Sequence, residues 1–429
     1  MMTFSKVFLT LSFIALFALL ANSAAWAQTT SPDIGWQEDL DFFEKELEER
    51  HIDLFHRLDA DAFHEEVEGL RRLGPSLSIH ERRVALMRLA RKIGDGHTAV
   101  PLWSDTIRRF PFEVTLVDDL VLVTGVSATH KHLLGATLTH VNGVPVADVK
   151  RQLADVVPFV ENDFSLRVRT GLYFLVEDML AGIGLVDADQ PTSLTFKNEG
   201  AVHSETVEAI DQVKFEDVLT HRLQPRHPEV HFTHQVSASD TLWFGESGDG
   251  KTLYIQLDRY PGQEEMQAFG DGVLARIRER GSHNLIIDLR HNFGGDFFSG
   301  LHLASILNLA DSVNWNDGVY VLIGNRTFSA AMSNAAQFRQ ILNAKLVGSP
   351  TGGRPCGYQD LGQFELPHSQ LTVTFSKRRF CFIDTADDSI YPDYMVKTAM
   401  SDFYGNTDSV LAWVMDDIAR LDKADGLSR

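Results

Sequence analysis

Apolar residues recur three and four positions apart through residues 36–93, which is the spacing of one face of an α-helix. This pattern predicts a series of three helices. The third helix is expected to begin with a capping box, in which Ser78 and Glu81 satisfy free backbone amides, and to stop at Gly94. The apolar faces consist of Leu40, Phe43 and Leu47, of Phe63, Val67 and Leu70, and of Val84, Met87 and Ile93.

Residues 101–235 have a less regular pattern, which predicts both strands and helices. Strand-like β-branched residues occupy 112–123, and residues 136–157 predict a strand, a tight Asn-Gly turn, a second strand and a helix. A polar stretch that contains prolines, 224–229, is expected to mark a boundary.

Beyond residue 240, short apolar runs alternate with amphipathic segments. A run such as 285–289 is typical of a strand that is buried on both faces of a parallel sheet. The alternation of strands and helices predicts βαβ units and a layered α/β domain. The expected strands are 253–257, 285–289, 319–323 and a run that starts at 346, and the expected helices are 264–280, 298–309 and 329–342.

The first 27 residues have a different pattern. Lys6 is the only cation of the amino-terminal stretch, residues 7–20 are almost wholly apolar, and an A-x-A triplet follows at 25–27. We therefore expect a signal peptide, 1–27, and an exported protein that is periplasmic or secreted. The apolar run is short for a membrane-spanning helix, so no stable membrane anchor is expected after cleavage.

Charge and cysteine content narrow the possible partners and cofactors. The chain has 429 residues and a formal net charge of −20 at neutral pH, so phosphate backbones repel it and nucleic acid is not an expected partner. The chain has neither an H-E-x-x-H motif nor paired C-x-x-C motifs, so no metal and no cofactor is expected. An oxidising compartment would permit a disulfide between Cys356 and Cys381, but the sequence leaves their pairing open.

Residues 245–252 match G-x-x-x-x-G-K-[ST], the pattern of a nucleotide-binding loop. That motif binds phosphates when a helix begins at its lysine, because the amides at the helix N-terminus hold the ligand. Here Lys251 is followed by the strand-like run 253–257. We therefore predict a hairpin loop rather than a nucleotide site.

Two segments that follow predicted strands hold residue types suited to catalysis. Ser329 lies before a predicted helix, where free amides and the positive end of the helix dipole favour an alkoxide and a developing oxyanion. Gly294 and Gly295 follow the strand 285–289, and their bare amides allow a substrate to approach closely. From position alone, a helix cap is the commoner role for the serine, and a tight turn for the glycine pair.

Four motifs occur in order along the carboxyl-terminal half of the chain: LIIDLRHNFGGD at 285–296, VYVLIGNRTFSAAM at 319–332, LVGSPTGG at 346–353 and IYPD at 390–393. Together they resemble the S41 peptidases, the tail-specific or C-terminal processing protease family. The helices followed by a DGHT motif at 95–98 resemble the amino-terminal part of many members that lack a full PDZ module. The segment 136–157 resembles a reduced PDZ-like remnant.

This resemblance implies a fold and a class of substrate. It implies a ClpP/crotonase-like layered α/β protease domain at 236–429. An N-terminal helical domain at 28–100 and a mixed α/β region with the PDZ-like remnant at 101–235 would precede it. Protein or peptide substrates are implied, without a metal or another cofactor.

The resemblance also implies Ser329 as nucleophile, with an oxyanion hole formed by the Ala330 amide and an amide of the Gly294-Gly295 pair. The processing-protease branch uses a lysine base after the TGG motif. This chain has Arg354 there, and arginine, whose pKa is above about 12, does not act as a base at working pH. A Ser–Lys dyad is therefore not expected.

The tricorn-like branch of the family uses a histidine base, and the DGHT motif supplies His97 in this chain. Histidine titrates near neutrality, so it can accept the nucleophile's proton and return it to the leaving amine. A third group should orient the imidazole. The tricorn-like branch places a glutamate shortly before its terminal PD, where this chain offers Asp387, with Asp384 as the alternative.

The sequence therefore predicts an exported serine endopeptidase that acts through an acyl-enzyme on Ser329, with His97 as general base. Two other functions stay open. Retinoid-binding relatives with the same fold are not enzymes, so a catalytically weak or inactive protein that binds an apolar ligand or a peptide is the main alternative. An ester or lactone substrate would keep the nucleophile but would not need a protonated leaving amine.

Overall fold

The computed structural model describes residues 32–104, 106–225 and 232–427. The expected signal peptide, 1–27, lies outside the described residues, as does most of the expected boundary at 224–229. Within the described ranges, no helix combines the length and the apolar character that a membrane span requires.

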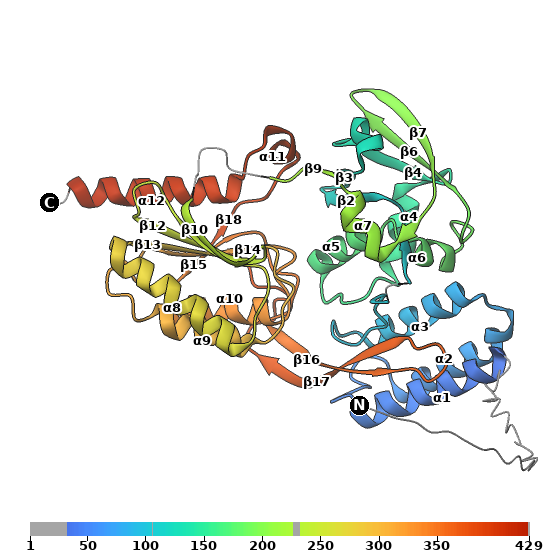
Figure 1. Cartoon of the computed structure of the whole chain (residues 1–429). Coiled ribbons are helices and arrows are strands. Elements are labelled where there is room, and N and C mark those ends of the chain that lie inside the picture. The colour runs from blue at the N-terminus through green and yellow to red at the C-terminus, as the bar shows by residue number, and fades with distance from the viewer. Residues whose placement is uncertain (1–31, 105, 226–231, 428–429) are drawn as a thin grey trace, which may run out of the picture.

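The expected amino-terminal helices are confirmed as α1 (Pro32–Arg50), α2 (Ala60–Leu73) and α3 (Ile79–Ile93), which are blue in Figure 1. The capping box of α3 is present, because the Ser78 amide donates to the Glu81 carboxylate at 2.7 Å and the Glu81 amide donates to the Ser78 hydroxyl at 3.3 Å. Gly94 ends the helix with a φ of 94°, a left-handed conformation that glycine adopts without strain.

The middle of the chain forms a sheet in the order β2-β3-β4-β6-β7, with β5 beside β4 and β9 beside β3. The strand, turn, strand and helix expected at 136–157 are confirmed by β4, β5 and α4. Apolar side chains of this region and of the amino-terminal helices form one continuous core. The elements are β1 (Arg108–Arg109), β2 (Phe112–Val117), β3 (Leu120–Val126), β4 (Thr137–Val141), β5 (Val144–Pro145), α4 (Val146–Ala154), α5 (Asp163–Tyr173), α6 (Glu177–Gly182), β6 (Thr192–Asn198), β7 (Ala201–Val207), β8 (Ile210–Asp211), α7 (Gln212–Val218) and β9 (His221–Arg222).

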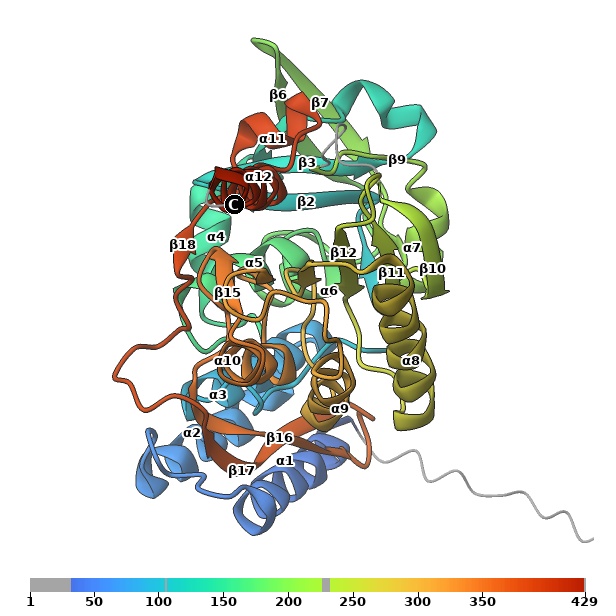
Figure 2. The same ribbon diagram turned by 90° about the vertical axis from the view of Figure 1, so that its left-hand side faces the viewer.

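The layered α/β domain is also confirmed. Its sheet has the order β10-β11-β12-β13-β14-β15-β18, and β12 to β18 run parallel along this path. Helices α8, α9 and α10 cover one face of the sheet and α12 covers the other (Figures 1 and 2). The elements are β10 (Thr233–Ser239), β11 (Leu242–Glu246), β12 (Thr252–Leu257), α8 (Gln263–Arg280), β13 (Asn284–Asp288), α9 (Phe297–Leu307), β14 (Val319–Ile323), α10 (Ala330–Ile341), β15 (Lys345–Gly348), β18 (Tyr394–Met395), α11 (Met400–Gly405) and α12 (Ser409–Leu427).

The segment that matches the nucleotide-binding pattern is a hairpin loop, as predicted. Strands β11 and β12 pair antiparallel on either side of it, with Glu246 opposite Leu253. Lys251 leads into β12 and not into a helix, so no helix N-terminus is present to hold a phosphate.

A long hairpin, β16 (Cys356–Glu365) and β17 (Thr372–Cys381), extends from the α/β domain and packs against the amino-terminal helices (Figure 1). Phe364 and Phe375 of this hairpin are buried in the core of those helices. The hairpin therefore joins parts of the chain that are far apart in sequence.

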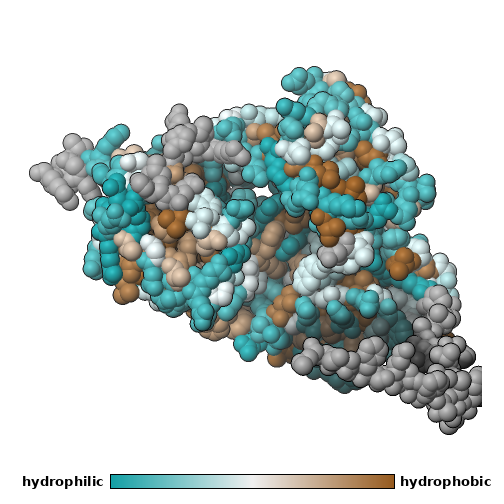
Figure 3. Space-filling model, viewed as in Figure 1, coloured by the Kyte–Doolittle hydropathy of each residue, from teal (hydrophilic) through white to brown (hydrophobic). Residues whose placement is uncertain are grey.

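Figure 3 shows that hydrophilic residues cover most of one face of the molecule. Apolar residues gather in the hollow between the α/β domain and the rest of the chain.

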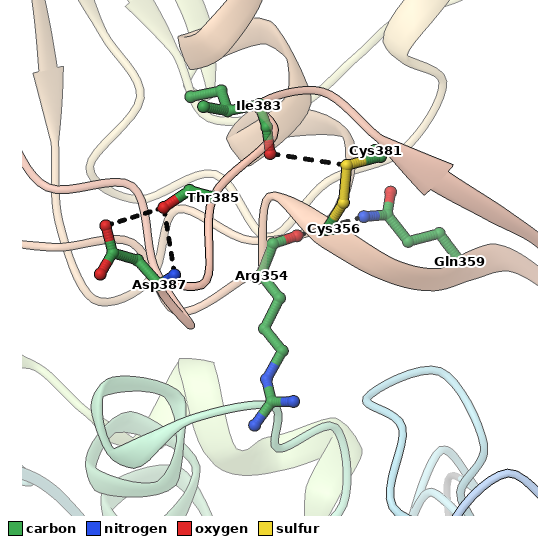
Figure 4. The surroundings of a disulfide bond; sticks show 7 residues. All are labelled: Arg354, Cys356, Gln359, Cys381, Ile383, Thr385 and Asp387. Carbon is green, nitrogen blue, oxygen red and sulfur yellow. Dashed lines mark hydrogen bonds between the residues drawn. A yellow bond between two sulfur atoms is a disulfide. The ribbon is translucent and has the colours of Figure 1, made fainter.

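A disulfide joins Cys356 to Cys381 at the base of this hairpin, where the two residues pair directly and their Cα atoms are 4.0 Å apart (Figure 4). The structure thus decides the pairing that the sequence left open.

Replacing both cysteines with alanine should lower the free energy of unfolding by about 2–4 kcal/mol, because the cross-link restricts the unfolded chain across the hairpin. Urea denaturation of the oxidised protein and the double variant measures the difference. A reductant should bring the wild type to the variant's midpoint. Equal midpoints before reduction would show that the hairpin needs no cross-link.

Candidate active site

The loops that follow β13, β14 and β15 meet at one edge of the parallel sheet, where ligands bind in α/β folds. The buried residue Thr327 connects all three loops. Its hydroxyl donates to the carbonyl of Leu289 at 2.8 Å, and its own carbonyl accepts from the amides of Gly352 and Gly353 at 3.0 and 3.3 Å. Three of the motifs that carry the S41 resemblance therefore meet at this edge of the sheet.

Ser329 immediately precedes α10 and has a φ of 50° and a ψ of −124°. A non-glycine residue with a positive φ is strained, and such strain occurs where a turn between a strand and a helix presents a side chain for chemistry. The Ser329 side chain makes no capping hydrogen bond to α10. The helix-cap role that position alone favoured is therefore not the one that the hydroxyl adopts.

The hydroxyl of Ser329 instead meets His97, whose Nε2 lies 2.8 Å from Oγ. His97 comes from the DGHT motif after α3 and is 3% exposed. Its ring stacks against Phe328, with the ring centroids 5.3 Å apart. Strand β17 fixes the backbone of this segment, because the hydroxyl of Thr374 donates to the carbonyl of His97 at 2.8 Å. The structure thus brings the predicted nucleophile and base together.

The buried carboxylate of Asp95 organises the loop that carries His97. Its Oδ1 accepts hydrogen bonds from the amides of His97 and Thr98 at 2.9 and 2.8 Å, and from the hydroxyl of Ser376 at 2.6 Å. Its Oδ2 lies 3.0 Å from Nε2 of His51. Since Nδ1 of that ring accepts from a backbone amide, Nε2 carries the proton.

These bonds determine the charge state of Asp95. Burial raises the pKa of the carboxyl, but the hydrogen bonds from His51, Ser376 and Thr98 outweigh burial and hold the pKa well below its usual range. Asp95 is therefore ionised in the folded protein at neutral pH.

The carboxylate beside the other imidazole nitrogen belongs to Glu161. Its Oε1 lies 3.3 Å from Nδ1 of His97, and both side chains are buried. The two atoms are close enough for an ion pair, but they are not aligned for a hydrogen bond. Nδ1 of His97 makes no hydrogen bond in the described part of the chain. Catalytic hydrogen bonds are often long in an unliganded site and shorten when the substrate binds. Glu161 therefore occupies the position of a third triad residue.

Two neighbours fix the position of Glu161. The amide of Arg354 donates to its Oε2 at 2.6 Å, and Nε of Arg354 donates to its carbonyl at 2.7 Å. Gly96 leaves the space that the carboxylate occupies, because a Cβ at this position would come within 2.2 Å of Cγ of Glu161. Arg354, which rules out a Ser–Lys dyad in this chain, thus supports the acidic group instead.

The structure contradicts the choice of Asp387 or Asp384 as the third residue. Both aspartates are exposed. Asp387 bonds within its own loop, accepting from the Thr385 hydroxyl at 2.9 Å and donating its amide to the same oxygen at 3.1 Å (Figure 4). The acidic residue comes from the segment before α5 instead, and the sequence signal for it is a single glutamate after the apolar run 156–160.

The glycine pair lies against Ser329 as expected, but its two amides differ. The amide of Gly294 donates to Asn292 Oδ1 at 2.8 Å, so it is not free to bind an oxyanion. Gly294 instead permits close approach, because a Cβ there would lie 2.7 Å from Cβ of Ser329 and 3.1 Å from the nitrogen of Ala330. Within the described ranges, the amides of Gly295 and Ala330 donate no hydrogen bond.

Asn292, a further residue of the site that the sequence did not predict, is fully buried. Besides accepting from Gly294, its side chain donates to the carbonyl of Leu257 at 2.8 Å. It thereby anchors the glycine loop to the end of β12.

A cluster of Glu44, Glu48 and His64 on α1 and α2 has the ligand types for a metal, but its side chains form ion pairs with one another.

We predict that Asp95→Asn lowers the free energy of unfolding at pH 7 by about 3 kcal/mol, because hydrogen bonds to a buried charge are lost. The folded state depresses the pKa of Asp95, so its stabilisation is present at neutral pH and is lost on acidification. Urea denaturation of wild type and variant should show the difference shrinking below about pH 5.

The exposed Asp387→Asn is the matched control for this experiment, and it should change stability by less than about 0.5 kcal/mol. A difference between wild type and Asp95→Asn that stays constant from neutral to acid pH would contradict the depressed pKa.

Comparison with known proteins agrees with the expected fold. No protein-family model matches the chain, and no curated protein matches its sequence. Mature CPAF complexed with lactacystin has 12% identity and a TM-score of 0.62 over 91% of this chain and 98% of that chain. Mature CPAF alone has 12% identity and a TM-score of 0.60 over 90% and 96%.

The photosystem II D1 C-terminal processing protease has 14% identity over 86% of this chain and 94% of that chain, with a TM-score of 0.43. The match to CPAF spans almost the whole of both chains and confirms the fold class that the S41 resemblance implies. This chain thus has the fold of mature CPAF, in agreement with its resemblance to the S41 peptidases.

Proposed function

We propose that this protein is a serine peptidase of the S41 type, which hydrolyses peptide bonds through an acyl-enzyme on Ser329. The observation that carries the proposal is the 2.8 Å contact between Nε2 of His97 and Oγ of Ser329. These residues are 232 positions apart in sequence, and a strained serine backbone and a buried imidazole are needed to bring them together. A role in packing alone would not require either.

In this mechanism, His97 accepts the proton of Ser329 as Oγ attacks the scissile carbonyl. The amides of Gly295 and Ala330, which donate no hydrogen bond among the described residues, are the donors for the tetrahedral oxyanion. The imidazolium then protonates the leaving amine, and His97 activates a water that hydrolyses the acyl-enzyme. Glu161 orients the imidazole and stabilises its charged form.

We also propose that the protein is exported. The apolar stretch and A-x-A triplet within 1–27 support a signal peptide. The disulfide between Cys356 and Cys381 agrees with an oxidising compartment such as the periplasm or the extracellular space.

Four variants test the triad. Ser329→Ala and His97→Ala should each reduce kcat by about 10⁴–10⁶, because they remove the nucleophile and its base. Glu161→Gln should reduce kcat by about 10²–10⁴, since an amide leaves the imidazolium without a counter-charge. Asp387→Asn, the matched carboxamide control, should keep the activity of the wild type because its side chain bonds to Thr385.

Hydrolysis of a fluorescent casein substrate measures these rates, and circular dichroism checks that each variant is folded. Loss of activity in Asp387→Asn together with wild-type activity in Glu161→Gln would support Asp387 as the third triad residue and would contradict Glu161.

Incubation of a proteome-derived peptide mixture with the mature protein tests the substrate class. New peptide termini should appear with the intact protein and not with Ser329→Ala, because amide cleavage needs the nucleophile. Mass spectrometry detects the termini and also gives the cleavage preference. Identical termini in the two samples, with ester substrates still hydrolysed by the wild type, would instead indicate an esterase.

A further inference from the structure

A partly exposed arginine lies among three aromatic rings, two of which belong to residues that directly precede Ser329 and the glycine pair. Arg169, on α5, has its Cζ 4.3 Å from the ring centroid of Phe293 and 5.2 Å from the centroids of Phe159 and Phe328. Phe328 directly precedes Ser329, and Phe293 directly precedes the glycine pair. The guanidinium of Arg169 therefore packs against the side chains next to Ser329 and next to the glycine pair in the sequence.

A second arginine approaches the same ring. Arg326 lies three residues before Ser329, and its Cζ is 5.8 Å from the centroid of Phe293. Burial lowers the pKa of Arg169 to about 10, and the positive charge of Arg326 acts in the same direction. Both guanidinium groups remain charged at neutral pH.

In the described part of the chain, neither arginine has an anionic partner, because neither side chain makes a hydrogen bond or an ion pair within 4 Å. The carboxylates that influence them, Glu161 for Arg169 and Glu113 and Asp258 for Arg326, act over longer distances. Buried charges in proteins are usually paired, and two adjacent like charges oppose each other.

Both arginines are nevertheless partly exposed, as is Phe293 between them, so a bound molecule can reach them. The positive charge is also unusual for its setting, because the whole chain has a net charge of −20. Two cations thus lie against residues that flank Ser329 and the glycine pair, in a chain whose overall charge is strongly negative.

We propose that Arg169 and Arg326 form a carboxylate-binding subsite, which gives the enzyme a preference for peptides that carry a carboxylate near the cleaved bond. This inference rests on the proposed peptidase function. A guanidinium pairs with a carboxylate through two parallel hydrogen bonds, and its face stacks on an aromatic ring, which matches the position of Phe293. The carboxylate can belong to an acidic side chain or to the C-terminus of the peptide.

Internally quenched peptides that differ in one group test the preference. One pair exchanges glutamate for glutamine at each position next to the cleaved bond, and another exchanges a free C-terminus for an amide. The wild type should favour the carboxylate form of one pair by about 10–100-fold in kcat/KM, the worth of a charge-assisted hydrogen bond. The pair that responds identifies the source of the carboxylate.

Arg169→Met and Arg326→Met should each lower the ratio of kcat/KM between the charged and neutral peptide by about tenfold, because each removes one guanidinium. Arg169→Lys, which keeps a charge, should retain part of the ratio. Arg151→Met is the matched control: its side chain on α4 is 74% exposed and bonds to Asp148, and the ratio should equal that of the wild type.

Binding of the same peptides to Ser329→Ala, measured by fluorescence anisotropy, separates this inference from the proposed function. Tighter binding of the charged peptide that depends on both arginines, without turnover by the intact protein, would support the subsite and refute the peptidase. Turnover with equal kcat/KM for charged and neutral peptides would refute the subsite and leave the peptidase intact. An equal rate loss on all peptides in both methionine variants would assign the arginines to packing.

Discussion

The proposed site depends on the buried carboxylate of Asp95. It receives the amides of His97 and Thr98, the hydroxyl of Ser376 and the ring of His51, and these groups come from three separate segments of the chain. An ionised carboxylate inside a protein is costly unless it is hydrogen-bonded on all sides, so each donor stabilises the position of the others. The backbone of the His97 segment is thereby held in place, with Nε2 of His97 2.8 Å from Oγ of Ser329, and a well-positioned base favours proton transfer.

The hairpin of β16 and β17 extends this constraint to the rest of the molecule. It begins after Arg354, whose backbone and side chain hold Glu161, and returns through Thr374 and Ser376, which hold the His97 segment. The hairpin and the arginine just before it therefore set the positions of both His97 and Glu161, although neither residue belongs to the hairpin. Its apolar side chains are buried among the amino-terminal helices, so packing of the helical region and geometry of the site are coupled.

The helices and strands, and Ser329 and His97 at the centre of the site, could be predicted because their sequence signals are local. Helical periodicity, the capping box and the alternation of strands and helices each depend on neighbouring residues, and ordered motifs identified Ser329 and His97. Glu161 could not be found in this way, because its role depends on Gly96 leaving space for it and on Arg354 binding it. The same holds for the amide of Gly294, whose partner Asn292 is visible only in the folded loop.

Reaction with a fluorophosphonate probe, followed by intact-mass and peptide-mapping mass spectrometry, tests whether His97 and Glu161 activate Ser329. One adduct is expected, on Ser329, which forms much more slowly in His97→Ala and Glu161→Gln and at the wild-type rate in Asp387→Asn. Absence of an adduct on the folded protein, or an adduct on Ser329 whose rate is the same in all four proteins, would contradict a serine activated by His97 and Glu161.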